Sequence, residues 1–177
     1  FQRVWDFIWA AGDMRVRGFL LGGTAGRTTL NGEGLQHQDG HSLLAASATP
    51  NIKAYDLAYA YEISTIIHFG MKEMVEENKD VLYYLTLENQ NYVHPPMPKN
   101  SEKGILKGLY NVIENKKASV QLFGSGPLLT EVLEAAELLK KDWGVESSVW
   151  SVTSYSELRK ESEEIERWNL NHPSEAL

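Results

Sequence analysis

The sequence lacks cysteine altogether, although it runs to 177 residues. This absence excludes disulfide bonds, thiolate metal ligands and cysteine nucleophiles, and it fits a reducing compartment, so we expect a cytoplasmic protein. Long apolar runs are absent as well, because no stretch of the sequence approaches the roughly 20 apolar residues that a membrane-spanning helix requires. We therefore expect that this chain does not associate with a membrane.

Positive charge is in deficit, since 17 lysines and arginines stand against 24 aspartates and glutamates and give a formal net charge of -7. A protein that binds nucleic acid needs a basic surface to neutralise phosphates, so nucleic acid is not an expected partner. A capping residue is also missing before the first helical stretch, "FQRVWDFIWAAGDM". We therefore expect the chain to be a piece of a longer one.

Strand and helix patterns alternate along the chain. Short apolar or β-rich runs predict strands, and longer amphipathic runs predict helices. The predicted strands lie within residues 17–23, 51–56, 81–89, 118–124 and 145–152. The predicted helices lie within residues 1–12, 41–50, 57–78, 127–143 and 153–168. This alternation favours an α/β protein with parallel sheets and crossover connections.

Three of the predicted helices carry specific signals. In the helix over 57–78, an apolar stripe predicts the buried face, which would consist of Ala60, Ile63, Ile67, Met71 and Met74. The helix over 127–143 is expected to have Pro127 in its first turn and to end at Gly144. The helix over 153–168 is expected to begin with a capping box formed by Ser154 and Glu157.

One segment has the composition of a linker. Residues 94–104, "HPPMPKNSEKG", combine clustered prolines with polar residues, and proline prevents both helix formation and sheet pairing. We therefore expect a domain boundary near this segment. His94 and His172 both precede prolines, and this position gives each of them an ordinary structural explanation.

The turn "GSGP" at 124–127 joins a predicted strand to a predicted helix, where backbone N–H groups could hold a phosphate. The dinucleotide-binding fingerprint requires a third glycine, and position 129 is a leucine. A plain strand-to-helix turn is the simpler interpretation.

The stretch "NGEGLQHQDGHS" at 31–42 is the densest group of polar residues on a glycine-rich backbone, and it includes Glu33, His37, Asp39 and His41. A metal site would need aligned ligands, but the H-E-x-x-H arrangement is absent and the glycines oppose a helix. No G-x-S-x-G nucleophile elbow is present either. Two interpretations stay open, namely a ligand-binding loop with a histidine that moves protons, and a structural loop.

The same stretch carries a resemblance to a known family. Residues 22–42, "GGTAGRTTLNGEGLQHQDGHS", together with "YDLAYAYE" and "ERWNLNHP", closely resemble the homodimeric bacterial type of pyruvate dehydrogenase. That enzyme is the decarboxylating first component of the pyruvate dehydrogenase complex. The segment "SVTSYSELRKE" also lies where the family has a matching strand and helix, and the likeness runs essentially from end to end.

The resemblance implies an α/β fold made of parallel-sheet, transketolase-like domains of the thiamin-diphosphate enzymes, both of them incomplete in this chain. Residues 1–97 would be the later part of the middle, pyrimidine-binding domain. Residues 98–177 would be the first part of the transketolase-type C-terminal domain.

The resemblance also implies a substrate, cofactors and partners. Pyruvate would be decarboxylated with thiamin diphosphate and Mg²⁺ bound between the two subunits of a homodimer, and the acetyl group would pass to the lipoyl-bearing acyltransferase component. Glu33 and His37 match active-site positions of the family. His37 would hydrogen-bond to the group derived from pyruvate or move protons, and Glu33 would belong to the same polar network. A histidine suits this role because its charge changes near neutral pH.

The sequence departs from the family in what it leaves out. The diphosphate and Mg²⁺ motif, G-D-G followed by an Asn, does not occur, and the glutamate and stacking aromatic that contact the cofactor's aminopyrimidine ring would lie before Phe1. We therefore expect the chain alone to be inactive and its cofactors to be bound largely by residues outside it. Two alternatives remain, a non-catalytic α/β interaction module and a transketolase-like or other 2-oxo acid dehydrogenase.

Overall fold

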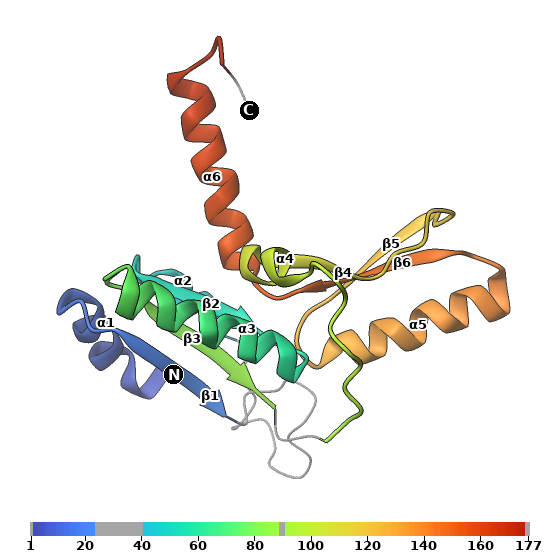
Figure 1. The fold of residues 1–177 in the computed structure, drawn as a ribbon, viewed down its shortest axis with the longest axis horizontal. Coiled ribbons are helices and arrows are strands. Elements are labelled where there is room, and N and C mark those ends of the chain that lie inside the picture. Colours follow the sequence, from blue (N-terminus) through green and yellow to red (C-terminus); the bar gives the residue numbers. More distant parts are fainter. Residues whose placement is uncertain (1, 24–40, 89–90, 176–177) are drawn as a thin grey trace.

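Within the described residues, two three-stranded sheets carry the fold (Figure 1). The structure is a computed structural model that describes residues 2–23, 41–88 and 91–175. The first sheet has the order β1-β3-β2, is parallel throughout, and consists of β1 (Gly18–Gly23), β3 (Leu82–Leu87) and β2 (Ile52–Asp56). The second has the order β4-β6-β5 and consists of β4 (Leu109–Ile113), β6 (Ser147–Val152) and β5 (Val120–Gly124). The segment predicted to be a linker lies between them in the chain.

Helices cover both faces of the first sheet. The elements around it are η1 (Gln2–Val4), α1 (Trp5–Asp13), α2 (Ser42–Ser47), α3 (Ala60–Met71) and η3 (Lys72–Glu76). On one face, Ile66 of α3 packs with Tyr83 and Leu85 of the central strand β3. On the other face, Ile8 of α1 and Ala46 of α2 pack against the sheet. Because both faces are covered, β3 is buried along almost its whole length, as is usual for the middle strand of a parallel sheet.

The predicted buried face of α3 is confirmed only in part. Met74 is buried and Ile63 and Ile67 pack half-buried against the core, whereas Ala60 and Met71 are exposed. The buried positions are instead Glu62, Ile66, Gly70, Glu73 and Met74. The apolar pattern did not predict this face fully, because the carboxylates Glu62 and Glu73 lie on the face that packs against the sheets.

The second sheet is mixed. β5 and β6 are parallel, but β4 is antiparallel to β6. This edge strand and the short helix before it, α4 (Glu102–Lys107), were not predicted from the sequence. α5 (Leu128–Trp143) packs on the sheet through Leu129, which is fully buried. Pro127 precedes its first turn and Gly144 ends it with a left-handed φ of 66°, so both predicted helix limits are confirmed.

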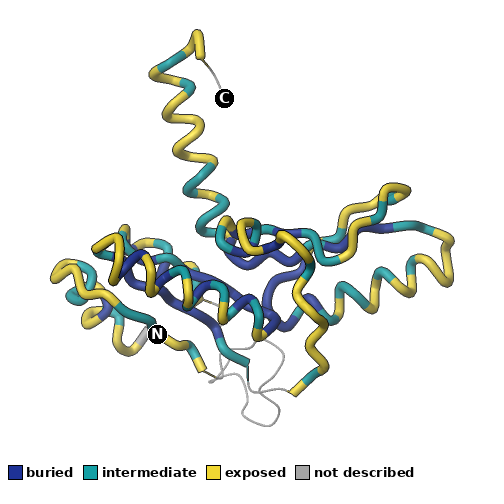
Figure 2. The backbone as a smooth tube through the Cα atoms, in the orientation of Figure 1, coloured by how far each residue is buried: buried dark blue, intermediate teal, exposed yellow. Residues whose placement is uncertain are grey.

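The last helix, α6 (Tyr155–Asn171), projects away from both sheets and buries none of its described side chains (Figure 2). Ser154 caps it, because the Ser154 hydroxyl accepts a hydrogen bond from the Glu157 backbone N–H at 3.1 Å. The Ser154 half of the predicted capping box is therefore confirmed. The reciprocal half is wrong, because the Ser154 backbone N–H donates to the Gly108 carbonyl at 3.2 Å and the Glu157 carboxylate pairs with Lys160 at 2.9 Å. No helix in the described ranges is long and apolar enough to span a bilayer.

A buried carboxylate ties the end of the α3–η3 helix to the first sheet. Glu73 accepts hydrogen bonds from Lys53 at 2.8 Å and from Lys79 at 3.0 Å, and it also accepts one from the Tyr83 hydroxyl. Burial opposes ionisation of this group, but the hydrogen bonds from Lys53, Tyr83 and Lys79 outweigh it and lower the pKa of Glu73. Glu73 is therefore a structural anion.

Replacing Glu73 with Gln is expected to destabilise the fold by about 1 to 3 kcal/mol at neutral pH, because a charged acceptor is lost from three donors. A carboxyl whose folded pKa is lowered stabilises the protein above its unfolded pKa, and this stabilisation is lost as the pH falls through the folded value. The difference from the wild type should therefore shrink below the ordinary pKa of 4.5. Denaturant unfolding at a series of pH values measures it.

The matched control is Glu77→Gln, because Glu77 pairs with the same Lys79 at 2.7 Å but is 35% exposed. An exposed pair contributes little, so this variant should change stability by less than about 1 kcal/mol. Equal effects of the two substitutions, or an effect of Glu73→Gln that grows in acid, would contradict the assignment.

Candidate active site at the carboxyl edge of the first sheet

The three parallel strands of the first sheet all end at the same edge. Gly23 at the end of β1 is paired with Leu87 of β3, and Asp56 at the end of β2 is paired with Thr86 of β3. Open α/β sheets bind ligands outside the carboxyl ends of their strands. The chain leaves this edge at Gly23 and re-enters the described structure before α2, so the stretch between them starts where ligands usually bind. The predicted site residues Glu33 and His37 belong to that stretch and lie outside the described residues.

Asp56 is the buried carboxylate at this edge, and it joins the two sheets. Its Oδ1 accepts a hydrogen bond from Thr86 Oγ1 at 2.7 Å, and its Oδ2 accepts one from Ser125 Oγ at 2.9 Å. Its backbone N–H donates to the Thr153 carbonyl at 2.8 Å. Asp56 therefore hydrogen-bonds to β3, to the turn before α5 and to the residue after β6, and so connects these three segments.

The "GSGP" turn is explained by this contact. A Cβ on Gly126 would lie 2.7 Å from Asp56 Oδ1, and the φ of Gly126 is +53°, so glycine is required on both counts. A carboxylate already occupies the space in front of the turn. Since it would repel a phosphate, the structure favours the plain strand-to-helix turn over a phosphate site.

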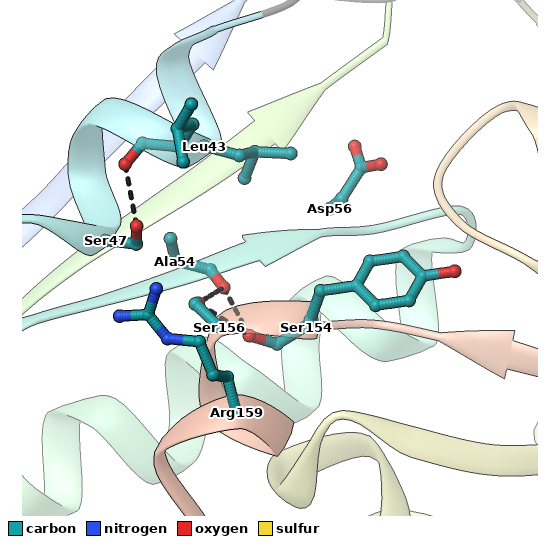
Figure 3. Close-up of a pocket in the computed structure, with 9 residues that line it drawn as sticks. Leu43, Ser47, Ala54, Asp56, Ser154, Ser156 and Arg159 are labelled. Carbon is teal, nitrogen blue, oxygen red and sulfur yellow. Dashed lines mark hydrogen bonds between the residues drawn. The ribbon is translucent and has the colours of Figure 1, made fainter. Parts of the chain in front are cut away.

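A cavity of about 550 Å³ opens beside Asp56, between α2, β2 and the start of α6 (Figure 3). Its volume falls in the range of roughly 300 to 1,000 Å³ that is usual for small-molecule sites. The side chains and backbone that line it belong to Leu43, Leu44, Ser47, Ala54, Asp56, Ser154, Tyr155, Ser156 and Arg159. The wall is mainly apolar, with Asp56 and Arg159 as its charged groups.

The serines of this cavity are already used as donors. Ser47 Oγ donates to the Leu44 carbonyl at 2.7 Å, and Ser154 Oγ and Ser156 Oγ both donate to the Ala54 carbonyl, at 2.6 and 3.2 Å. Their oxygens can therefore only accept further hydrogen bonds, and Ser154 Oγ already accepts one from the Glu157 backbone N–H. Arg159 therefore supplies the donors for an acidic group, although its guanidinium also pairs with Glu163 at 3.2 Å.

A second buried carboxylate, Glu62, lies at the start of α3 and has no exposed surface. Its Oε2 accepts from the backbone N–H groups of Ala58 and Tyr59, at 2.6 and 3.0 Å. Its Oε1 accepts from Tyr110 of β4 at 2.6 Å and from Ser151 of β6 at 2.7 Å. The carboxyl group therefore bridges the two residues just before α3 and the second sheet.

Burial raises the pKa of Glu62, and the hydrogen bonds from Tyr110, Tyr59, Ser151 and Ala58 oppose that rise. Burial also raises the pKa of Tyr110, and the charge of Glu62 raises it further. Tyr110 O–H is committed to Glu62, so in the 2.6 Å contact between the two phenols Tyr61 must donate to Tyr110. The hydrogen-bond donors of this network thus converge on the buried carboxyl group of Glu62.

The described residues do not offer a site for the cofactors implied by the resemblance. In the parts of the chain that the structure describes, no group of three or more His, Cys, Asp or Glu side chains could hold a metal ion. The one glycine turn between strand and helix in the second sheet faces Asp56 rather than open space. The described residues therefore offer no carboxylate or histidine cluster for Mg²⁺, and the GSGP turn offers no diphosphate site.

Sequence reasoning missed both buried carboxylates at this junction, Asp56 and Glu62. Asp56 and Glu62 lie in "YDLAYAYE", which was noted only for its resemblance. The available signal was an acidic residue at the end of a predicted strand and another in the first turn of a predicted helix. Neither position reveals that its partner comes from the second sheet.

Two family descriptions divide the chain between them. The pyruvate dehydrogenase E1 component middle domain matches residues 1–95, which is more than half of the chain. The chain belongs to the pyruvate dehydrogenase E1 component family. The transketolase-like C-terminal domain matches residues 108–176.

Curated relatives support the family assignment. The pyruvate dehydrogenase E1 component of Pseudomonas aeruginosa is 57% identical over 99% of this chain, and that of Escherichia coli is 54% identical over 99%. In both cases the chain spans only 20% of the relative's length.

Solved structures agree on the fold. A transketolase variant from Pichia stipitis matches with a TM-score of 0.68 and 24% identity, over 90% of this chain and 23% of that one. The transketolase of Campylobacter jejuni matches with a TM-score of 0.69 and 21% identity, over 89% of this chain and 24% of that one. This chain thus has a transketolase-like α/β fold.

Proposed function

We propose that this chain is a part of a pyruvate dehydrogenase that decarboxylates pyruvate with thiamin diphosphate and Mg²⁺ and passes the acetyl group to the lipoyl group of the acyltransferase component. The observation that carries the proposal is the identity of 57% with a pyruvate dehydrogenase E1 component across 99% of the chain. The carboxyl-edge position at which the segment with Glu33 and His37 leaves the first sheet supports it further.

In this proposal the chain contributes protein groups, and the cofactors are held by residues outside it. His37 binds the reacting pyruvate or moves protons, and Glu33 orients the polar groups around it. Thiamin diphosphate supplies the electron sink for decarboxylation when it is bound. Two subunits would complete each site in a homodimer, and the division into residues 1–97 and 98–177 would follow the domains of the whole protein.

The test uses the full-length protein that contains this chain. With thiamin diphosphate and Mg²⁺ added, it should release CO₂ from pyruvate with an artificial electron acceptor, and it should acetylate a lipoyl domain in a second assay. Omitting the cofactor should abolish both signals. Turnover of a different 2-oxo acid or of a sugar phosphate, with none of pyruvate, would instead indicate a related dehydrogenase or a transketolase. Absence of turnover on every donor would favour the non-catalytic module.

A further inference from the structure

The segment that connects the two sheets is attached to the start of α3 by two aromatic residues. We name residues 91–101 the strap. Its Tyr92 hydroxyl donates to the Ala58 carbonyl, and the Tyr92 and His94 rings stack with centroids 4.9 Å apart. His94 also meets the Tyr59 ring edge to face, at 5.6 Å and 64°. The strap also meets α3 where Thr65 Oγ1 donates to Met97 Sδ at 3.9 Å, and Ser101 at its end is buried, whereas most of its other residues are exposed.

One hydrogen bond in this attachment fixes the protonation state of His94. The backbone N–H of Ala60, the first residue of α3, points at His94 Nδ1 with an N–N distance of 3.0 Å. A backbone N–H can only donate, so Nδ1 must be the acceptor, and the ring proton must be on Nε2. Adding a proton to Nδ1 would place two N–H groups against each other at the positive end of a helix.

His172 gives the opposite case within the same chain. Its Nδ1 lies 3.0 Å from the Trp168 carbonyl, and its ring stacks on the Trp168 ring at 3.8 Å. A carbonyl can only accept, so here Nδ1 must be the donor. Protonation leaves that bond intact. The two histidines that precede prolines therefore use Nδ1 in opposite roles, as an acceptor in His94 and as a donor in His172.

The groups around His94 do not replace the lost acceptor. The titratable side chains that face its ring are the phenols of Tyr59, at the start of α3, and of Tyr92, on the strap. The carboxylates that act on these phenols are Glu62, Asp56 and Glu88. Their negative charge attracts an imidazolium to this region, but it cannot give the Ala60 N–H a new partner.

We propose that His94 controls the attachment of the strap through its protonation: neutral His94 binds the strap to the first turn of α3, and protonated His94 releases it. This goes beyond the proposed function and does not depend on it. Histidine side chains in general change charge between about pH 5 and 8. The effect of the release is on the connection between the two sheets.

The test is hydrogen exchange measured by mass spectrometry on the full-length protein, at about pH 8 and about pH 5 and corrected for the intrinsic rates. In the wild type, peptides covering the strap and residues 57–66 should exchange about three- to tenfold faster at the lower pH, the effect of losing one hydrogen bond. Exchange at the histidine C2 position, followed in the same samples, should show His94 gaining its proton over that range. Unchanged protection, or a His94 that stays neutral, would overturn the proposal.

Two substitutions separate the bond from general acid effects. In His94→Asn the amide oxygen takes the place of Nδ1 and accepts without titrating, so exchange should stay slow at both pH values. In His94→Ala exchange should be fast at both. His172→Asn should keep the wild-type response. A pH response that persists in His94→Asn would show that another group is responsible.

Discussion

Replacing Glu62 with alanine is expected to separate the second sheet from the start of α3, with a loss of about 3 to 5 kcal/mol in local stability. Four donors lose their acceptor at once, and two of them are backbone N–H groups that have no other way to be satisfied. The loss corresponds to a factor of at least about 100 in the opening equilibrium. Hydrogen exchange at the β4 and β6 amides of the full-length protein measures it.

Milder variants of the same network test the reason for the loss. Glu62→Gln should cost less than about 2 kcal/mol, because hydroxyls can turn to accept from the new amide whereas backbone N–H groups cannot. Tyr110→Phe should cost about 1.5 to 3 kcal/mol, since it leaves a fully buried carboxyl oxygen with one donor fewer. Tyr61→Phe, which removes only the hydroxyl next to Tyr110, should cost about 1 kcal/mol or less. Equal losses in all four variants would mean that packing, not the carboxylate, holds this junction.

Replacing His37 with alanine in the full-length protein is expected to lower pyruvate decarboxylation by well over tenfold. A positioned general acid or base typically accelerates a reaction by about 100- to 10,000-fold, so loss of such a group should be unmistakable. Steady-state rates with an artificial acceptor report decarboxylation, and acetylation of a lipoyl domain reports the later step. A histidine that serves only acetyl transfer would lower the second rate and spare the first.

The matched control is His68→Ala, because His68 lies on the exposed side of α3. It should leave both rates unchanged and should leave the thermal unfolding of the protein near the wild type. Activity that survives His37→Ala at the wild-type level would remove the catalytic role and favour a loop that serves only association.

The order of strands and helices could be predicted from the sequence because each carries its own local signal. Leu82–Leu87 is a compact apolar run, and the last two helices have Pro127, Gly144 and Ser154 at their limits. β4 gave no comparable signal, since "LYNVI" is short and is buried at only one of its five positions. It becomes a strand because β6 offers an edge to pair with.

The roles of the residues at the candidate site could not be predicted as well, because they depend on contacts between residues far apart in the sequence. Glu62 lies in what looks like a solvated first turn, yet its partner Ser151 lies 89 positions along the chain. His94 was assigned an ordinary role from the proline that follows it, and only the Ala60 contact reveals which of its nitrogens accepts. Local sequence patterns predict helices and strands. Hydrogen bonds between carboxylates and hydroxyls that are far apart in the sequence become apparent only in the three-dimensional structure.

The outer edge of β2 has a consequence for self-association. The carbonyls of Ile52 and Ala54 accept from Lys160 and from the Ser154 and Ser156 hydroxyls, while the Asp56 N–H donates to Thr153. An uncovered strand edge is a template on which a strand of another molecule can be added, and this is a common start of aggregation. Here the residues around the start of α6 already hydrogen-bond to the backbone groups of β2 that such a strand would need. A strand of another molecule could therefore add to this edge only after the start of α6 has separated from β2.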